Sequence, residues 1–501
     1  MTIDNNNKGE MEVGLKRHMG LLAAVNVILN VMIGSGIFVS PQNALKFSGS
    51  VGACLLVWLI CGIISLIGAL CFAELGSVVP KSGAEYAYLM EAFGKKKNFW
   101  GPLPAFVCAW VYVLILRPAE IAIIILTFSE YSIQPFHSIL GLENLSADQK
   151  SNLVKLFSFL TLAIITYINL TSVKLYVKLN NIFGFAKVFA CFIVIAGGAY
   201  HLILGKTSNL QSGFEGTNLK FGFISLSLYN GLWSFDGWSS VTTITEEIKS
   251  PHKNIPRSIL IAVPLVTLLY VFMNVAYMAV LEKDEMINSA AVGISFAEQA
   301  LGPVGFLIPI GVALSTFGCA MSIQFGVTRL CFVAGREGHM LEPLSYIHVK
   351  KHTPAPAVFL QGVLSVIFLS VGDISALIEF ASFLIWFFYG TACVCLLVMR
   401  KTHAHVERSY KVPIILPIIT LCVSVFLVLT PLIDEPDIKY LSAVGFILSG
   451  VLAYVPFVYY KVRPRIMDEF TQFIQLFFMV VPTTNLEDEN CNTIANDEKI
   501  H

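Results

Sequence analysis

Charged residues are scarce in this chain. Only 13% of its 501 residues are Asp, Glu, Lys or Arg, whereas 56% are hydrophobic. Soluble domains contain roughly a quarter charged residues, so a water-soluble protein of this length could not cover so many apolar side chains. The formal net charge is zero, and no basic excess indicates a nucleic-acid partner.

Several patterns that would indicate other protein classes are also missing. The 11 cysteines lie in or beside apolar segments, except Cys491 near the C-terminus, and no predicted external loop carries one. This distribution is typical of packing residues rather than of a disulfide framework. We find no metal-spaced cluster, no phosphate-binding glycine loop and no Ser-His-Asp pattern. We therefore predict no enzyme activity, no catalytic residue, no cofactor and no metal site, and His339 is interpreted as an inner-loop residue.

Long apolar runs recur along the whole chain, each near the roughly 20 residues needed to cross a bilayer. They predict an all-α polytopic membrane protein. The first twenty residues are polar and the first apolar run is long enough to span, so we expect no cleavable signal peptide. The twelve predicted spans are 21–46, 51–77, 103–131, 153–171, 180–204, 221–245, 258–281, 304–332, 356–371, 374–399, 412–433 and 440–461.

The basic residues predict the orientation, because cytoplasmic loops are enriched in Lys and Arg. With twelve spans and both termini cytoplasmic, the basic clusters all fall on the inner side: Lys95 to Lys97, Lys350 with Lys351, Arg400 with Lys401, and Lys461 with Arg463 and Arg465. We predict cytoplasmic tails at 1–20 and 464–501 around a transporter domain at 21–463. That domain divides into inverted repeats of about 21–204 and 221–399, followed by two further helices within about 412–461.

Two spans are interrupted by small residues at matching positions. The first contains Gly34-Ser35-Gly36 within VMIGSGIFVSP, which is compatible either with close helix packing or with a helix break. The sixth reads SLYNGLWSFDGWSSVTTITEE and carries Asp236-Gly237 at mid-depth. Paired interruptions in two halves of a membrane protein are a sequence indicator of a transporter site. We therefore predict two five-helix halves whose first helices are both broken.

Broken helices can bind an amino acid through their backbone. A half-helix that starts near Ile37 would direct free N–H groups and the positive end of its dipole at a carboxylate. Half-helices that end near Ile33 and Trp233 would present free carbonyls to an ammonium group. Such a site needs little side-chain chemistry, which explains the small residues Ser35 and Gly36.

Asp236 and Trp233 carry side-chain chemistry into this site. A carboxylate near the bilayer centre costs at least about 2.5–3.5 kcal/mol and needs a cavity or a partner. Asp236 either faces the substrate and favours a cationic side chain, or forms a structural pair with a basic residue of a neighbouring span. Trp233 either covers the substrate as a gate and stacks on its cation, or is a packing residue.

Other ionisable residues lie in or beside the spans. Lys187, in IFGFAKVFACFIVI, either occupies the place of a sodium ion or forms an ion pair unrelated to coupling. Arg117 and Glu120 lie three residues apart and can pair on one helix face. Glu246 and Glu247 end the sixth span near basic residues. They either latch an inner gate through ion pairs or are surface charges without a further role.

Four segments together carry a family resemblance: VMIGSGIFVSP, FAELGSVVPKSGAEYAYL, GLWSFDGW with ITEEIKSPHKNIPRSI, and FVAGREGHMLEPLSYIHVKKHTPAPAV. They resemble the light chains of heteromeric amino-acid transporters, the L-type exchangers of the amino acid–polyamine–organocation superfamily. The resemblance covers about residues 15–485. It implies a LeuT-like fold with a 5+5 inverted repeat, and sodium-independent, obligatory exchange of amino acids across the plasma membrane.

The run Trp-Ser-Phe-Asp-Gly-Trp is most similar to the b-zero-plus type of light chain. This likeness implies exchange of cationic for large neutral amino acids, with cystine as a further candidate. It also implies that Lys187 stands in place of sodium. The expected substrate-binding residues are Ile33, Ser35, Gly36, Ile37, Trp233, Ser234 and Asp236.

The chain departs from the family in the loop SIQPFHSILGLENLSADQKSN, between the third and fourth spans. Light chains carry a cysteine there that joins them to a glycoprotein heavy chain, and this loop has none. A disulfide-linked heavy chain is therefore not expected, while a non-covalent partner stays open. The same loop contains Asn144-Leu145-Ser146, a glycosylation sequon. The eighth span has GCAMSIQFG where relatives have an Asn-Gly pair.

The expected ligands are amino acids, in a protein surrounded by membrane lipid. Two alternatives to exchange remain at this point on the same fold. One is a uniporter or proton-coupled carrier, which would move substrate without substrate on the opposite side. The other is an amino-acid sensor, which would bind without flux.

Overall fold

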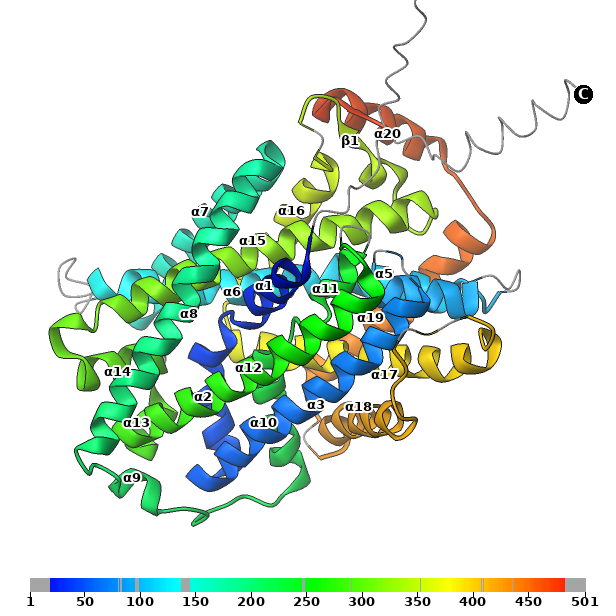
Figure 1. The fold of residues 1–501 in the computed structure, drawn as a ribbon. Coiled ribbons are helices and arrows are strands. Elements are labelled where there is room, and N and C mark those ends of the chain that lie inside the picture. Colours follow the sequence, from blue (N-terminus) through cyan, green and yellow to red (C-terminus); the bar gives the residue numbers. More distant parts are fainter. Residues whose placement is uncertain are drawn as a thin grey trace, which may run out of the picture.

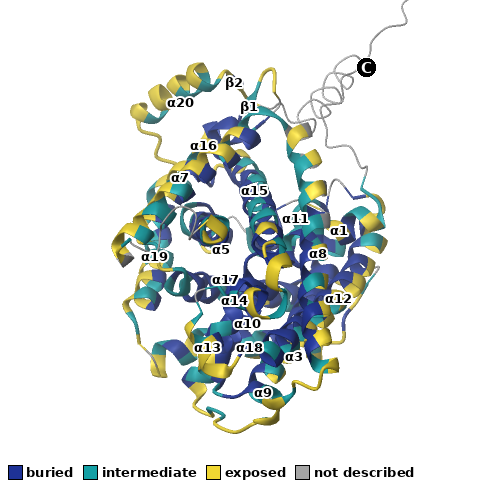
Figure 2. Ribbon diagram, turned by 90° about the vertical axis from the view of Figure 1, so that its left-hand side faces the viewer, coloured by how far each residue is buried: buried dark blue, intermediate teal, exposed yellow. Residues whose placement is uncertain are grey.

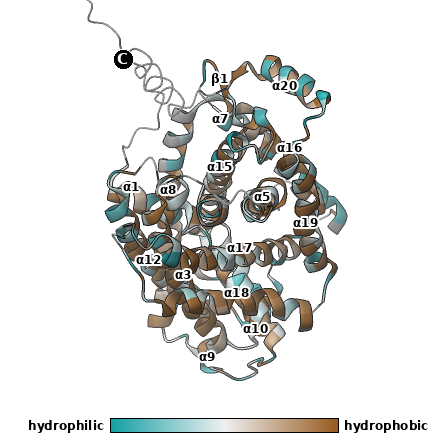
Figure 3. Cartoon of the chain, turned by 90° about the vertical axis from the view of Figure 1, so that its right-hand side faces the viewer, coloured by the Kyte–Doolittle hydropathy of each residue, from teal (hydrophilic) through white to brown (hydrophobic). Residues whose placement is uncertain are grey.

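The computed structural model describes residues 19–79, 81, 83–94, 99–136, 145–245, 248–289, 291–351, 353–406, 408, 410–434 and 436–482. Its helices pack into one bundle (Figure 1). Buried residues gather in the middle of the bundle, while the peripheral helices expose one face (Figure 2). Many of those outer faces are strongly hydrophobic (Figure 3), as expected of helices that contact lipid.

The N-terminal half contains helices that match the predicted spans closely. They are α1 (Leu21–Met32), α2 (Gly36–Ser48), α3 (Val51–Val78), α4 (Glu85–Leu89), η1 (Met90–Gly94), α5 (Leu103–Val111), η2 (Tyr112–Leu116), α6 (Arg117–Ile133), η3 (Gln134–Phe136), α7 (Ala147–Thr171), α8 (Val173–Ile203) and α9 (Ser208–Gln211). α5, η2 and α6 follow one another without a gap and form the third span.

The second half contains α10 (Phe221–Phe235), α11 (Ser240–Thr243), α12 (Pro251–Val280), α13 (Lys283–Asn288), α14 (Val292–Ala300), η6 (Gly302–Val304), α15 (Leu307–Arg336), η7 (Glu342–Ser345), β1 (Ile347–His348), α16 (Ala355–Val371), α17 (Ile374–Thr402), α18 (Ile415–Asp434), α19 (Ile438–Tyr454), η8 (Val455–Tyr459), α20 (Arg465–Phe478) and β2 (Val480–Val481).

The number of membrane-crossing helices agrees in part with the prediction. Within the described residues, nine helices are long and apolar enough to span, and α1 with α2 makes a tenth as one bent pair. The other two predicted spans fall on α10 with α11, which is interrupted, and on α16, which has 17 residues. The polytopic all-α class is confirmed, while the count of twelve and the repeat boundaries stay predictions.

Both predicted interruptions occur as backbone breaks. α1 ends at Met32 and α2 begins at Gly36, with a bend of 50° between them. α10 ends at Phe235 and α11 begins at Ser240, and Gly237 between them has a φ of 108°. That angle lies where side chains with a Cβ are disfavoured. In the first span, the helix-break alternative is therefore the correct one.

The C-terminal segment folds back onto the bundle. β2 pairs with β1 in an antiparallel two-stranded sheet, and α20 packs on η7 and α16. The predicted tail at 464–501 therefore begins with an ordered helix. Seven residues of the sequence predictions lie outside the described residues: Lys95, Lys96, Lys97, Asn144, Glu246, Glu247 and Cys491.

Candidate functional site

A cavity of about 300 Å³ lies beside the two helix breaks. It opens between α1, α11, α15 and the segment from Gly83 to Glu85, and it reaches Met19 and Ala23 near the start of α1. The polar and charged groups on its wall are Asn26, Asn30, Glu85, Tyr112, Arg117, Tyr176, Asn180, Asp236, Ser239, Ser240, Thr243, Ser322 and Arg329. The cavity is thus polar at the depth of the breaks and extends to the end where α1 begins.

Asp236 lies at the α10 break and lines this cavity. The Tyr389 hydroxyl on α17 donates a hydrogen bond of 2.5 Å to Asp236 Oδ1. Among the described residues, Asp236 forms no ion pair with Lys, Arg or His. The alternative of a structural pair with a basic residue therefore finds no partner in this part of the chain.

The carbonyl groups at the end of α1 are occupied by side chains from other helices. Lys187 Nζ on α8 donates to the Asn30 carbonyl at 2.6 Å. The three following carbonyls, of Val31, Met32 and Ile33, accept from Cys319, Tyr270 and Ser315 respectively. A carbonyl oxygen has two lone pairs. The Met32 carbonyl also accepts from the Gly34 N–H, whereas the carbonyls of Asn30, Val31 and Ile33 can still accept a hydrogen bond from a ligand.

Lys187 is a buried cation held by backbone. Its side chain is 1% exposed, and among the described residues no Asp or Glu forms an ion pair with it. The ammonium group lies where the last turn of α1 concentrates partial negative charge. The alternative interpretation, in which Lys187 forms an ion pair, therefore has no acidic residue to support it in the described structure.

The N-terminus of α2 is packed tightly against α10. Ser35, Gly36 and Ile37 are all buried, and so is Ser234 on α10. A Cβ atom at Gly36 would lie 2.5 Å from Ser234 Cα. None of these four residues, nor Ile33, lines the cavity in this conformation, although each lies within a few residues of Asn30 or Asp236.

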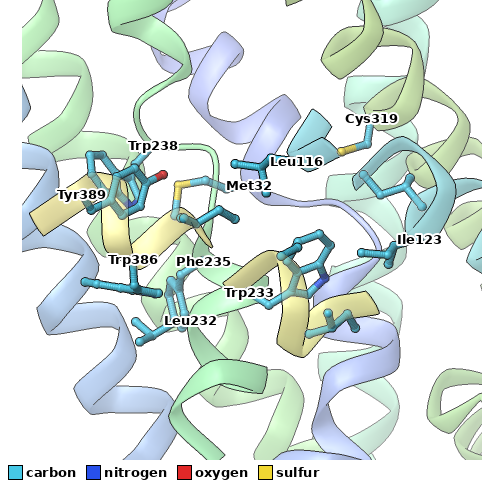
Figure 4. Close-up of a cluster of buried hydrophobic side chains, with 14 of the residues drawn as sticks. Met32, Leu116, Ile123, Leu232, Trp233, Phe235, Trp238, Cys319, Trp386 and Tyr389 are labelled. Atoms are coloured by element: carbon cyan, nitrogen blue, oxygen red, sulfur yellow. The ribbon is translucent and has the colours of Figure 1, made fainter. Parts of the chain in front are cut away.

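Trp233 is 8% exposed and lies one turn before Asp236. Figure 4 shows its indole directed toward Ile123, on the opposite side of the α10 end from Trp238, Trp386 and Tyr389. Trp238 packs on Tyr389 with ring centroids 4.6 Å apart. Trp233 is therefore next to the break without being part of the large cavity.

A group of charged residues forms another wall of the cavity. Arg117 Nη1 donates to Glu120 Oε2 at 2.6 Å, which confirms the predicted pair. The Arg117 guanidinium also lies 5.0 Å from the centroid of the Tyr112 ring. Arg117 lines the cavity, so the pair contributes to the site as well as to helix packing.

Tyr389, Tyr112 and Glu85 are among the site residues that the sequence analysis did not identify. Each is far in sequence from the broken helices and reaches the site only through packing of α17, η2 and α4. Four residues of GCAMSIQFG on α15 line the cavity, as does Arg329 after it: Ser322, Ile323, Phe325 and Gly326. Of the first three residues, Glu85 had a sequence signal, because it is an acidic residue in the segment that follows an apolar span.

Neither break nor cavity carries the elements of a metal site. No group of three or more His, Cys, Asp or Glu suited to a metal ion occurs among the described residues. His339 Nδ1 instead forms a hydrogen bond of 2.9 Å with the Tyr86 hydroxyl, and burial lowers the pKa of His339 to about 4.

Comparison with known proteins identifies the family. The sequence model of the amino acid permease family matches residues 19–480. The chain belongs to this family. It is a multi-pass membrane transporter and not an enzyme.

The relatives span nearly the whole chain. The mouse b(0,+)-type amino acid transporter 1 is 44% identical over 470 residues, which are 93% of this chain and 94% of that protein. The human cystine/glutamate transporter is 38% identical over 480 residues, 95% of this chain and 92% of that protein. The mouse large neutral amino acids transporter small subunit 2 is 35% identical over 469 residues, 93% of this chain and 85% of that protein. The predicted relationship to L-type light chains is confirmed.

Proposed function

We propose that this chain is a sodium-independent amino-acid exchanger that carries cationic and large neutral L-amino acids, with cystine as a further substrate. The observation that carries the proposal is Asp236, an acidic residue at a helix break on the wall of a 300 Å³ cavity. A half-buried carboxylate without a basic partner among the described residues attracts a cationic side chain. The similarity to the b(0,+)-type transporter supports the same substrate class.

The amino-acid backbone binds between the two breaks. Ser35, Gly36 and Ile37 begin α2, where N–H groups without helical partners and the dipole favour a carboxylate. The Ile33 carbonyl at the end of α1 and the last carbonyls of α10 near Ser234 accept from the α-ammonium. Trp233 closes over the substrate as the gate.

Sodium independence follows from Lys187. Its ammonium group already neutralises the carbonyl end of α1, which supports the idea that no free cation is needed there. In a sodium-coupled carrier of this type, unwound backbone carbonyls coordinate the ion.

The cavity suggests which side of the protein is open. It includes Met19 and Ala23, at the N-terminal start of α1, whereas α2 and α10 are tightly packed beyond the break. With both termini cytoplasmic, this is an inward-open conformation at the plasma membrane. Alternating access then requires α1 and α11 to close this opening while α2 and α10 separate.

This chain has no cysteine in the external loop that could form a disulfide with a heavy chain. The loop 132–152 contains no cysteine, and the ten cysteines in the described part are all unpaired. The protein acts alone or with a non-covalent partner. A glycan is attached to this chain at Asn144.

The deciding experiment uses proteoliposomes that contain only this chain. Efflux of labelled arginine is measured without sodium, into buffer with leucine, with arginine or with no amino acid. We expect efflux only when an amino acid is outside. Equal efflux into empty buffer would indicate a uniporter, and dependence on a proton gradient would indicate a proton-coupled carrier. Saturable binding without flux would indicate a sensor.

A further inference from the structure

The cavity contains a second acidic residue that no step above uses. Glu85 begins α4 directly after Gly83 and Ala84, and its side chain is only 3% exposed. All three residues line the cavity. Ala84, directly before Glu85, has a φ of 44°, which is disfavoured for a residue with a Cβ, whereas the φ of 112° at Gly83 is open to glycine.

One carboxylate oxygen of Glu85 has no hydrogen-bond donor among the described residues. This atom, Oε1, is buried. The hydroxyl of Tyr112, which lines the same cavity, is also buried and unpartnered there. A buried polar group without a partner costs about 1–3 kcal/mol, and a ligand in the cavity would remove that cost.

The nearby cations are already engaged. Arg117 pairs with Glu120 at 2.6 Å and lies over the Tyr112 ring. Arg329, on another wall, lies 3.6 Å from the centroid of the Phe325 ring. Arg117 already pairs with Glu120, which is not part of the cavity wall. Glu85 and Asp236 both line the cavity, and neither forms an ion pair among the described residues, so the cavity can accommodate one more positive charge.

We infer that Glu85 is a second recognition site for the side-chain cation of the substrate, so that Asp236 and Glu85 act together on a guanidinium or ammonium group. This inference rests on the proposed function and refines its substrate specificity. A guanidinium carries five N–H donors in a planar fork, which suits two carboxylates on separate walls. The Tyr112 hydroxyl accepts a further N–H.

The two carboxylates have different surroundings, which gives them different parts in the site. Asp236 already accepts a hydrogen bond from Tyr389, which holds its orientation. Glu85 Oε1 has no such donor in the described structure. Neutral substrates leave Glu85 without a ligand, so Glu85 distinguishes arginine from leucine.

The test measures apparent KM values for arginine and leucine in proteoliposomes of the full chain. Glu85→Gln should raise the KM for arginine about tenfold or more and change that for leucine less than twofold. Glu85→Asp keeps the charge and should recover part of the arginine affinity. Glu130→Gln, on α6 and outside the cavity wall, serves as a matched control that should change neither.

A double-mutant cycle with Asp236→Asn tests whether both acids contact one cation. The effects of the two substitutions on arginine KM should then be non-additive, because contacting groups couple. Equal changes for arginine and leucine, or no change in Glu85→Gln, would overturn the inference.

A separate binding measurement keeps this inference distinct from the proposed function. Arginine should raise the thermal unfolding temperature of the purified protein more than leucine does, and Glu85→Gln should lose that difference. If the wild type shows the arginine shift without exchange, the exchanger proposal fails while the Glu85 site stands. If exchange occurs and Glu85→Gln keeps the arginine preference, the Glu85 site fails alone.

Discussion

Single residues give the cavity its chemistry, because most of its wall is neutral. Asp236 contributes a carboxylate held by Tyr389, and Lys187, which does not line the cavity itself, donates to the carbonyl of the lining residue Asn30. The types of these residues could be interpreted from sequence, since an ionisable group in an apolar span needs a partner or a function. Their partners could not, because Tyr389 lies 153 residues from Asp236 and Lys187 lies 157 residues from Asn30.

The first residue prediction concerns Asp236. Asp236→Asn removes the charge while keeping the size, and should reduce arginine exchange roughly ten- to a hundredfold, since a hydrogen bond to a charged group contributes about 1.5–3 kcal/mol. Leucine exchange should stay within threefold. Tyr389→Phe should give a smaller loss for arginine, because it removes only one neutral donor. Equal losses for both substrates would contradict a role in charge selection.

A second prediction follows from His339, which lies after α15 and outside the spans. Burial lowers its pKa to about 4, so the neutral form is favoured in the folded protein. Between pH 6.5 and 4 the unfolded chain binds the proton and the folded protein does not, so stability should fall as pH falls. The loss should approach roughly 3 kcal/mol near pH 4.

The measurement is thermal unfolding of purified protein across this pH range. His339→Gln should show a flatter curve between pH 6.5 and 4, with His405→Gln as an exposed control. The same pH slope in both variants would show that other groups are responsible.

At the scale of elements, the site depends on how the two broken helices pack. The breaks were predictable because Gly34, Gly36 and Gly237 interrupt otherwise apolar helices. The close contact between the start of α2 and Ser234 on α10 was not predictable, because no local sequence pattern indicates which helices pack together. That contact makes Gly36 necessary for packing as well as for the break.

Gly36→Ala tests this contact. The new Cβ would lie 2.5 Å from Ser234 Cα, so α2 and α10 must move apart. Overpacking of this kind costs about 1–3 kcal/mol, and we expect a lower unfolding temperature and weak exchange. Gly445→Ala on α19 meets no atom within 4 Å and should be neutral or stabilising. Similar behaviour of both variants would mean that the contact does not constrain the protein.

Lys187 links α8 to the end of α1. Lys187→Met should leave the Asn30 carbonyl without this donor and lower stability by about 1–3 kcal/mol. If the ammonium group occupies the place of sodium, sodium chloride should restore part of the lost unfolding temperature and choline chloride should not. The wild type should respond alike to both salts. Identical responses in the variant would leave Lys187 as a structural residue only.

At the scale of the whole molecule, the cavity extends from the two helix breaks to the start of α1, and α20 folds back beside η7 and α16. The family and the membrane-spanning character were predictable from long apolar runs and from motifs spread over the chain. The C-terminal helix α20 was not expected, because it lies beyond the last apolar span, and because the strands β1 and β2 that pair beside it are far apart in the chain.

Surface expression tests whether the whole molecule needs a partner. Expressed without a heavy chain, the protein should reach the plasma membrane and migrate equally with and without reductant. Glycosidase should increase its mobility on a gel, and Asn144→Gln should abolish that shift. Retention inside the cell until a heavy chain is added would contradict self-sufficiency.

The sequence alone determined the class, the two helix breaks and the residue types at the site. These depend on composition and short-range pattern: apolar runs long enough to span, small residues that interrupt them, and ionisable groups where lipid forbids them. Only the tertiary structure decided which groups meet. In the tertiary structure, the carbonyls at the end of α1 accept hydrogen bonds from Lys187, Cys319, Tyr270 and Ser315. Glu85 lies on the wall of the same cavity as Asp236. Such contacts join residues far apart in the chain, and packing of whole helices selects them rather than any local preference.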